Sequence, residues 1–193
     1  MAHRAFALAP DPSAISRMFG DPAAAKAEIM GHWAAAAAHP DGEAMNVELM
    51  RSREFPYPYS MPGLLACAAA ELQGGMQAHW DMFDRVQRAH AVEARNIADA
   101  EVLRSCAADI GLDPVRWESD YQSPAARHAV DADTAEARRL GVNAVPTLIF
   151  NRRWALPGAV PEAAQERVVT DILEGRDPSV GEEWLQLVGG ADR

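Results

Sequence analysis

Cysteine is scarce in this chain, and the two that occur, Cys67 and Cys106, lie far apart among its 193 residues. Their separation matches neither a Cys-x-x-Cys redox motif nor a zinc site, and two cysteines cannot build a dense disulfide framework. Both fall on apolar stripes of predicted helices, where a free cysteine is usually a small core residue. The sequence therefore offers no residue for the role of a catalytic thiol.

Positive charge and long apolar runs are also in short supply. Lysine and arginine number 18 against 28 aspartate and glutamate residues, and the net charge of −10 repels phosphate backbones and anionic lipid surfaces. The longest apolar stretches, such as residues 33–38, are too short to span a bilayer, and residues 1–8 lack the apolar core of a secretory signal. We therefore expect a cytoplasmic protein that binds neither nucleic acid nor membranes.

Hydrophobic residues, by contrast, make up 49% of the sequence, enough for one sizeable core. Apolar residues in the segment 3–8 predict a short strand closed by a proline-rich turn. An aspartate followed by proline opens a predicted helix over residues 22–38, which residues 39–42 should end. After a proline-rich connector over residues 55–62, the pattern is helical to about Leu140, with helices beginning at Asp99 and Ser123.

The hydrophobic period changes after this helical block. Residues 147–150 form a compact β-prone run, residues 151–153 suit a tight turn, and residues 154–156 can return as a second strand. Pro161 begins a final helix, which ends before Gly175. This order of elements predicts an α/β fold whose sheet is interrupted by an all-helical insertion.

The step from Val145 to Pro146, directly before the predicted strand, suggests a binding loop. A cis proline is plausible here, and it would leave the backbone N–H and C=O of the preceding residue pointing outward, where an extended peptide could pair with them. A trans proline at the first position of a strand is common, and the local sequence alone favours it. Both interpretations stay open at this point.

Residues 140–151, followed by residues 154–159, resemble the cis-proline loop and terminal β-hairpin of the DsbA-like thioredoxin-fold family. Residues 96–113 are similar to the helical insertion of its cytoplasmic FrnE-type branch, and residues 4–11 to the second strand of that branch. The resemblance extends to about Gly175. It implies a thioredoxin-like, DsbA-type sheet formed by residues 1–12 and 141–176, a mainly helical insertion over residues 13–140, and a C-terminal tail over residues 177–193.

The chain departs from this family at its start. In the family, a first strand and a helix that opens with Cys-x-x-Cys come before the segment that resembles residues 3–8. The resemblance therefore implies an N-terminally incomplete fold, with the missing strand between residues 3–8 and 147–150. Backbone groups at such a gap need a partner, and we expect a second chain to be able to fill it by strand addition, as in a homodimer.

The resemblance also implies a substrate-binding site and no catalytic residue in this chain. Ala144, Val145 and Pro146 would bind an extended peptide or a protein thiol substrate, and Tyr59 and Ser60 could line the same groove. A packed proline-rich connector is the simpler interpretation of Tyr59 and Ser60. The histidines His79, His90 and His128 lack metal-site spacing and should be hydrogen-bonded or solvated, so we expect no metal and no cofactor.

Three functions fit these observations. The first is a protein-disulfide oxidoreductase of the DsbA-like family whose Cys-x-x-Cys is missing from this chain. The second is a non-catalytic relative that binds peptides or a partner chain. The third is a glutathione-dependent isomerase similar to 2-hydroxychromene-2-carboxylate isomerase, in which a serine replaces the first cysteine. The coding sequence upstream of Met1 discriminates among them, since an in-frame Cys-x-x-Cys supports the first and a serine there supports the third.

Overall fold

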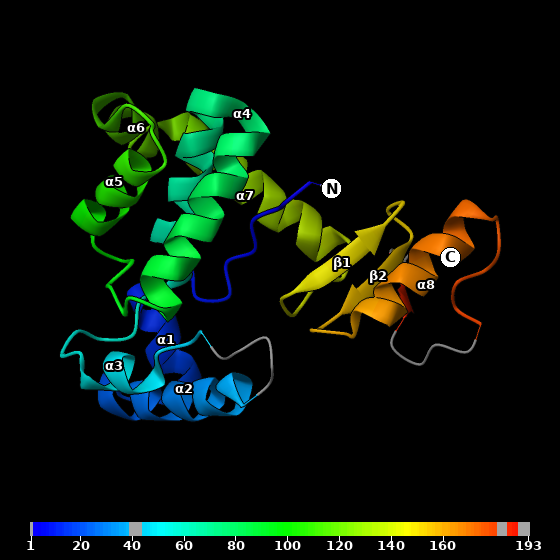
Figure 1. The fold of residues 1–193 in the computed structure, drawn as a ribbon, viewed down its shortest axis with the longest axis horizontal. Helices are drawn as coiled ribbons and strands as arrows, with labels where there is room; N and C mark the ends of the chain where they lie inside the picture. Colours follow the sequence, from blue (N-terminus) through cyan, green and yellow to red (C-terminus); the bar gives the residue numbers. More distant parts are fainter. Residues whose placement is uncertain (1, 39–43, 181–184, 189–193) are drawn as a thin grey trace. The chain divides into compact units, whose positions relative to one another are not determined.

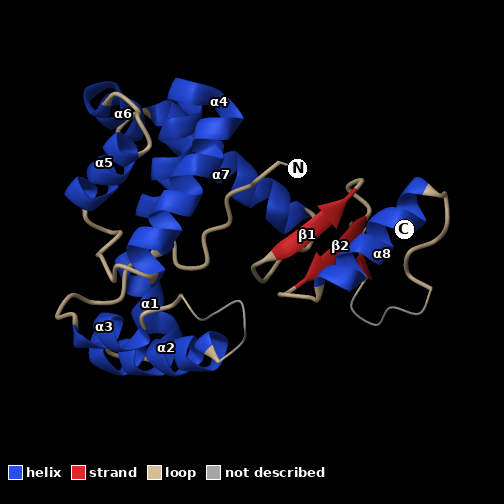
Figure 2. Cartoon of the chain, in the orientation of Figure 1, coloured by secondary structure: helices blue, strands red, loops and turns tan. Residues whose placement is uncertain are grey.

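A computed structural model describes residues 2–38, 44–180 and 185–188 of the protein. Contacts between residues divide the chain into two compact units, Met1–Asp131 (unit 1) and Ala132–Arg193 (unit 2). The described part contains eight helices and three short strands (Figure 1, Figure 2). In chain order they are α1 (Pro12–Phe19), α2 (Pro22–Ala37), α3 (Val47–Ser52), α4 (Ser60–Ala91), α5 (Ala100–Asp109), α6 (Pro114–Tyr121), α7 (Pro124–Arg139), β1 (Thr147–Phe150), β2 (Trp154–Pro157), α8 (Glu162–Leu173) and β3 (Gln186–Leu187).

Aspartate caps begin several of these helices. The carboxylate of Asp21 accepts hydrogen bonds from the first free N–H groups of α2, and Asp99 does the same for α5. These two starts were predicted, as was the start of α7 at Pro124. The stop predicted for α2 at residues 39–42 lies outside the described residues. The short helices α1 and α3 were not predicted, and α6 was not recognised as a separate helix.

The longest helical segment, α4, is two antiparallel helices joined at Gly75. This residue has φ 71° and ψ −165°, a conformation outside the helical region. A Cβ atom built on Gly63 would lie 3.6 Å from Cγ1 of Val86. A straight helix would separate those two residues by about 35 Å, so the chain must fold back on itself. We call this pair of helices the α4 hairpin.

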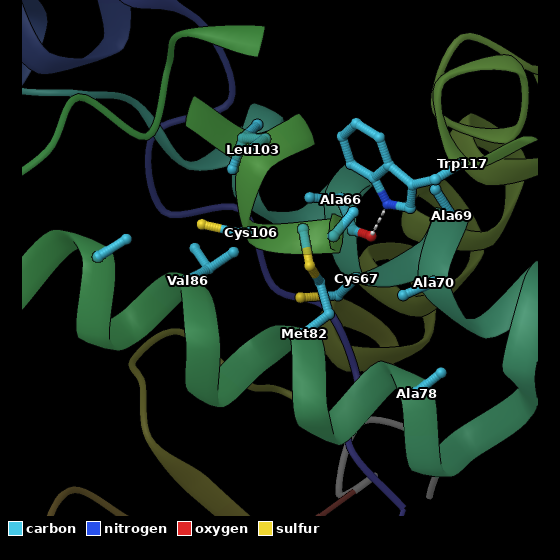
Figure 3. Close-up of a cluster of buried hydrophobic side chains, with 12 residues drawn as sticks. Ala66, Cys67, Ala69, Ala70, Ala78, Met82, Val86, Leu103, Cys106 and Trp117 are labelled. Carbon is cyan, nitrogen blue, oxygen red and sulfur yellow. Dashed lines mark hydrogen bonds between the residues drawn. The ribbon is translucent and has the colours of Figure 1, made fainter. Parts of the chain in front are cut away.

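The core of unit 1 is built on the α4 hairpin. Trp117 of α6 is buried against it, and its indole Nε1 donates a hydrogen bond of 3.2 Å to the carbonyl of Ala66 (Figure 3). Small side chains let the helices approach closely. The buried residues of this cluster are Ala66, Cys67, Ala69, Ala70, Ala78, Met82, Val86, Ala89, Leu103, Cys106, Ala107 and Trp117.

The prediction of a strand at residues 3–8 is wrong, since residues 2–7 have no regular secondary structure. Alternate residues of this apolar segment are nevertheless buried, namely Ala5 and Ala7. They pack with Met61 of α4 and Val130 of α7. The alternation therefore reflects packing against helices and not the pairing of strands. The grouping of residues 1–12 with residues 141–176 in one domain stays a prediction.

Unit 2 contains the sheet, whose described strands have the order β1-β2-β3 and are antiparallel. The predicted hairpin of β1 and β2 is confirmed, with Leu148 opposite Leu156 and a turn at Asn151 and Arg152, both of which have positive φ. Helix α8 packs on the sheet through Val168. Within residues 177–193, expected to be a tail, β3 adds a short strand beside β2. None of the helices in the described ranges is long and apolar enough to cross a membrane.

Candidate functional site

The loop formed by Ala144, Val145 and Pro146 lies at the start of β1, and all three residues are exposed. The peptide bond between Val145 and Pro146 is cis. The carbonyl of Pro146 accepts a 2.8 Å hydrogen bond from the backbone N–H of Gly158, and the hydroxyl of Thr147 donates one of 2.8 Å to the carbonyl of Ala144. The loop is therefore held at both ends while its side chains face outward.

The strand that follows this loop is an edge strand among the described residues, because β1 pairs only with β2. In an antiparallel ladder, residues with backbone groups directed at the partner strand alternate with residues whose groups point away. The bond between Gly158 and Pro146 fixes this alternation, so Leu148 and Phe150 face β2. The backbone groups of Thr147 and Ile149 then point to the open edge. This edge can accept another extended chain.

Acidic and basic side chains pair near the turn between β1 and β2. Glu136 of α7 pairs with Arg139 on the same helix and with Arg152 in the turn after β1. The hydrogen bond from Arg139, together with the charge of Arg152, lowers the pKa of Glu136. The carboxylate is thus neutralised by two guanidinium groups, and the pair links α7 to the β-hairpin within unit 2.

Tyr59 and Ser60 lie in unit 1, whereas the loop 144–146 lies in unit 2. Tyr59 immediately precedes α4 and packs on two hydrophobic clusters. The backbone N–H of Ser60 donates to the carbonyl of Ala9 over 2.8 Å, and its Oγ accepts from the N–H of Ala9 over 3.0 Å. The hydroxyl of Ser60 therefore anchors the N-terminal segment. A role for Tyr59 and Ser60 in substrate binding stays a prediction.

Both cysteines belong to the core, as predicted from their positions on apolar stripes. Burial, with a smaller contribution from Asp84, raises the pKa of the Cys67 thiol to about 12. Burial also raises the pKa of Cys106. Because the thiolate is the reactive form, neither side chain is suited to disulfide exchange in the folded protein.

Two buried histidines form polar clusters that the sequence did not reveal. Nδ1 of His79 lies 2.8 Å from a carboxylate oxygen of Glu71, and its Nε2 lies 2.8 Å from Nδ1 of His3. His90 is 3.0 Å from the hydroxyl of Tyr57. The prediction that these histidines are hydrogen-bonded is confirmed, and His128 is exposed. Over the described ranges, no group of three or more His, Cys, Asp or Glu side chains is arranged to hold a metal ion.

Comparison with known proteins identifies the family to which this protein belongs. A sequence family described as thioredoxin matches residues 24–155. A candidate protein disulfide isomerase from Nitrosomonas europaea superimposes with a TM-score of 0.68 over 79% of this chain and 76% of its own, at 20% identity. The cytosolic disulfide reductase DsbM of Pseudomonas aeruginosa superimposes with a TM-score of 0.57 over 70% of this chain and 68% of its own, at 26% identity. The fold is thioredoxin-like, with a large helical part and a small sheet. The chain belongs to the DsbA-like thioredoxin-fold family.

Curated relatives have other roles. The ClpXP adapter protein SpxH of Shouchella clausii is 33% identical over 94 residues, which cover 49% of this chain and 30% of the adapter. The Na⁺/H⁺ antiporter NhaA of Herminiimonas arsenicoxydans is 34% identical over 118 residues, or 61% of this chain and 17% of the antiporter. The chain thus spans less than a third of the length of these relatives. Their names do not transfer to it.

Proposed function

We propose that the chain is the peptide-binding part of a thiol–disulfide oxidoreductase. In this proposal, the loop 144–146 and the open edge of β1 bind an extended peptide, and Cys67 and Cys106 take no part in disulfide exchange. The observation that carries the proposal is the combination of an exposed loop with an edge strand directly behind it. The kinship to a disulfide reductase of 26% identity supports the reaction class. That reductase is cytosolic, and we propose the cytoplasm for this chain as well.

Binding would occur by strand addition. The backbone groups of every second residue point to the same side of a strand. Those of Val145 therefore point to the open edge, like those of Thr147 and Ile149. An extended peptide about 4.8 Å away could pair with these groups, and its side chains would alternate between the two faces of the sheet. The hydrogen bonds involve the peptide backbone, so this surface would accept many sequences. A second copy of the chain is the alternative occupant of the edge.

Exchange itself needs a thiolate that attacks one sulfur of a disulfide and releases the other as a thiolate, which leaves a mixed disulfide. Such a thiolate is usually stabilised at a helix N-terminus or by nearby positive charge. Cys67 and Cys106 have the opposite environment, because burial raises the pKa of both. In this proposal, the loop 144–146 and the edge of β1 would supply binding, and neither Cys67 nor Cys106 would supply exchange chemistry.

A non-catalytic binding protein is the second candidate. It is favoured by the two buried cysteines and by relatives that are named as ClpXP adapters. It would use the same surface and would differ only in lacking any coupled dithiol.

The loop can be tested with an aspartate at Val145, a side chain that is 45% exposed. We expect Val145→Asp to weaken the binding of a fluorescein-labelled, S-alkylated insulin B chain at least tenfold, or about 1.4 kcal/mol, because the carboxylate would be desolvated beneath the peptide. Fluorescence anisotropy measures the affinity, and far-UV circular dichroism checks the fold.

Val169→Asp is the matched control. Val169 is a valine of similar exposure, 41%, and it lies on α8 in the same unit. Its variant should bind within about twofold of the unmodified protein, since exposed substitutions away from a site change little. Equal affinities for both variants, or no binding by the unmodified protein, would refute the proposed peptide site.

A further inference from the structure

The N-terminal segment, residues 2–9, is attached to the α4 hairpin at two places. At one end, Ala9 exchanges hydrogen bonds with Ser60. At the other end, the imidazole of His3 contacts the imidazole of His79. Between the two attachments, the segment has no regular secondary structure, and only small side chains such as Ala5 are buried. Polar contacts therefore carry much of the docking of this segment.

The fold of the α4 hairpin assembles the site at its His3 end. Glu71 lies on the first helix and His79 on the second, and the reversal at Gly75 brings their side chains to 2.8 Å. His79 is buried, while Glu71 remains partly exposed. Aromatic rings surround His3, whose ring centroid lies 5.0 Å from that of Trp80 and 4.3 Å from that of Phe83.

The donors and acceptors among Glu71, His79 and His3 follow from the chemistry of the carboxylate and the imidazoles. The ionised carboxylate of Glu71 can only accept, so Nδ1 of His79 donates to it. Neutral His79 then has an acceptor at Nε2, and Nδ1 of His3 donates to that atom. Glu71 and the aromatic faces around His3 are compatible with a single positive charge on the pair of imidazoles.

A second proton cannot be accommodated in the same geometry. It would place an N–H group on each of His3 and His79 across a distance of 2.8 Å, with two positive charges and no acceptor between them. The nearby charged residues of the segment and of α4 are Arg4, the exposed Asp81 and Asp84, and Arg85, which pairs with Glu93 and Asp109. Helix α7, which packs on the segment through Ala126 and Val130, adds Arg127, Asp131 and Asp133. None of these side chains can stand between the two ring nitrogens, which are only 2.8 Å apart.

We propose that Glu71, His79 and His3 form a pH-sensitive latch, which holds residues 2–9 on the α4 hairpin and releases them when both imidazoles are protonated. Release would uncover the side chain of Met61, against which Ala5 and Ala7 pack. It would also free Ser60 from Ala9. All groups of the latch lie in unit 1, whereas Val145 lies in unit 2.

A nitroxide spin label on Leu8→Cys tests the latch, since Leu8 is exposed and the two native cysteines are buried. The mobile component of the spectrum should rise from less than about a tenth at pH 7.5 to more than about half at pH 4.5, a range that spans the ordinary titration of histidine. In the same background, His3→Phe keeps a ring between Trp80 and Phe83 but cannot be protonated. Its label should show the same mobility at both pH values.

Two controls separate release of the segment from general unfolding. His128→Gln changes an exposed histidine and should leave the transition unchanged. His90→Gln removes a buried histidine of another cluster and should also preserve it. The latch is refuted if the unmodified background shows no transition, if the transition persists in His3→Phe, or if it disappears in His90→Gln.

Discussion

The protein is expected to lose about 3 kcal/mol of stability between pH 7 and pH 4 through His90 alone. Burial lowers the pKa of His90 from its ordinary value of 6.5 to about 4, and the Arg95 backbone offsets only part of this effect. The side chain is 8% exposed. Tyr57 accepts a hydrogen bond from the indole of Trp33, and its hydroxyl lies 3.0 Å from Nε2 of His90.

The sign of the effect follows from proton binding. The unfolded chain binds a proton to His90 near pH 6.5, whereas the folded chain resists it until about pH 4. Between these values the unfolded state holds more protons, so its free energy falls relative to the folded state as the pH decreases. The stability from neutral His90 is therefore complete above pH 6.5 and is lost by about pH 4.

Urea unfolding at pH 7, 5.5 and 4 measures this effect. In His90→Gln the side-chain amide can still form a hydrogen bond with Tyr57, but the titration is gone. The difference in unfolding free energy between the unmodified protein and this variant should change by about 3 kcal/mol over the range, and exposed His128→Gln should show no such change. Parallel pH profiles for the unmodified protein and His90→Gln would contradict the assignment.

Replacement of Gly75 by alanine is expected to destabilise the protein by about 1–3 kcal/mol. Gly75 has φ 71° and ψ −165°, a region that is essentially restricted to glycine. Alanine would also favour a continuous helix over residues 60–91, which would separate Gly63 from Val86 and open the core around Trp117. The reversal of the α4 hairpin thus depends on this single residue.

Gly31→Ala provides the matched control in α2. A Cβ atom on Gly31 would meet no atom within 4 Å, and the residue lies inside a helix. Alanine should leave stability unchanged or raise it by up to about 1 kcal/mol. Gly74 is unsuitable, because its added Cβ would lie 2.7 Å from that of Ala78. Urea unfolding measures the change in stability of both variants. A Gly75→Ala variant as stable as Gly31→Ala would show that the turn does not require glycine.

Local signals in the sequence predicted most of the regular elements. Aspartate caps and proline starts located α2, α5 and α7, and the β-prone run before Asn151 located the hairpin of β1 and β2. Separate apolar stripes before Gly74 and after Gly75 indicated the two helices of the α4 hairpin, but they did not show that the chain reverses between them. The prediction of a strand at residues 3–8 was wrong because a short apolar segment indicates burial but does not identify the element it packs against.

The candidate site was predictable only in part. The exposed loop 144–146 follows from its position before a strand, and the buried cysteines follow from their apolar stripes. The clusters around His79 and His90 could not be predicted, because they join side chains that are dozens of positions apart in the sequence. Only the tertiary packing of unit 1 brings those groups within hydrogen-bond distance.

Amide hydrogen exchange with and without S-alkylated insulin B chain tests the central claim most directly. The N–H groups of Leu148 and Phe150 face β2 and should exchange slowly in both states, whereas those of Thr147 and Ile149 face the open edge. Saturating peptide should slow exchange at Thr147 and Ile149 at least about tenfold, because strand addition would give these donors acceptors. Bound peptide that leaves both rates unchanged would contradict the account.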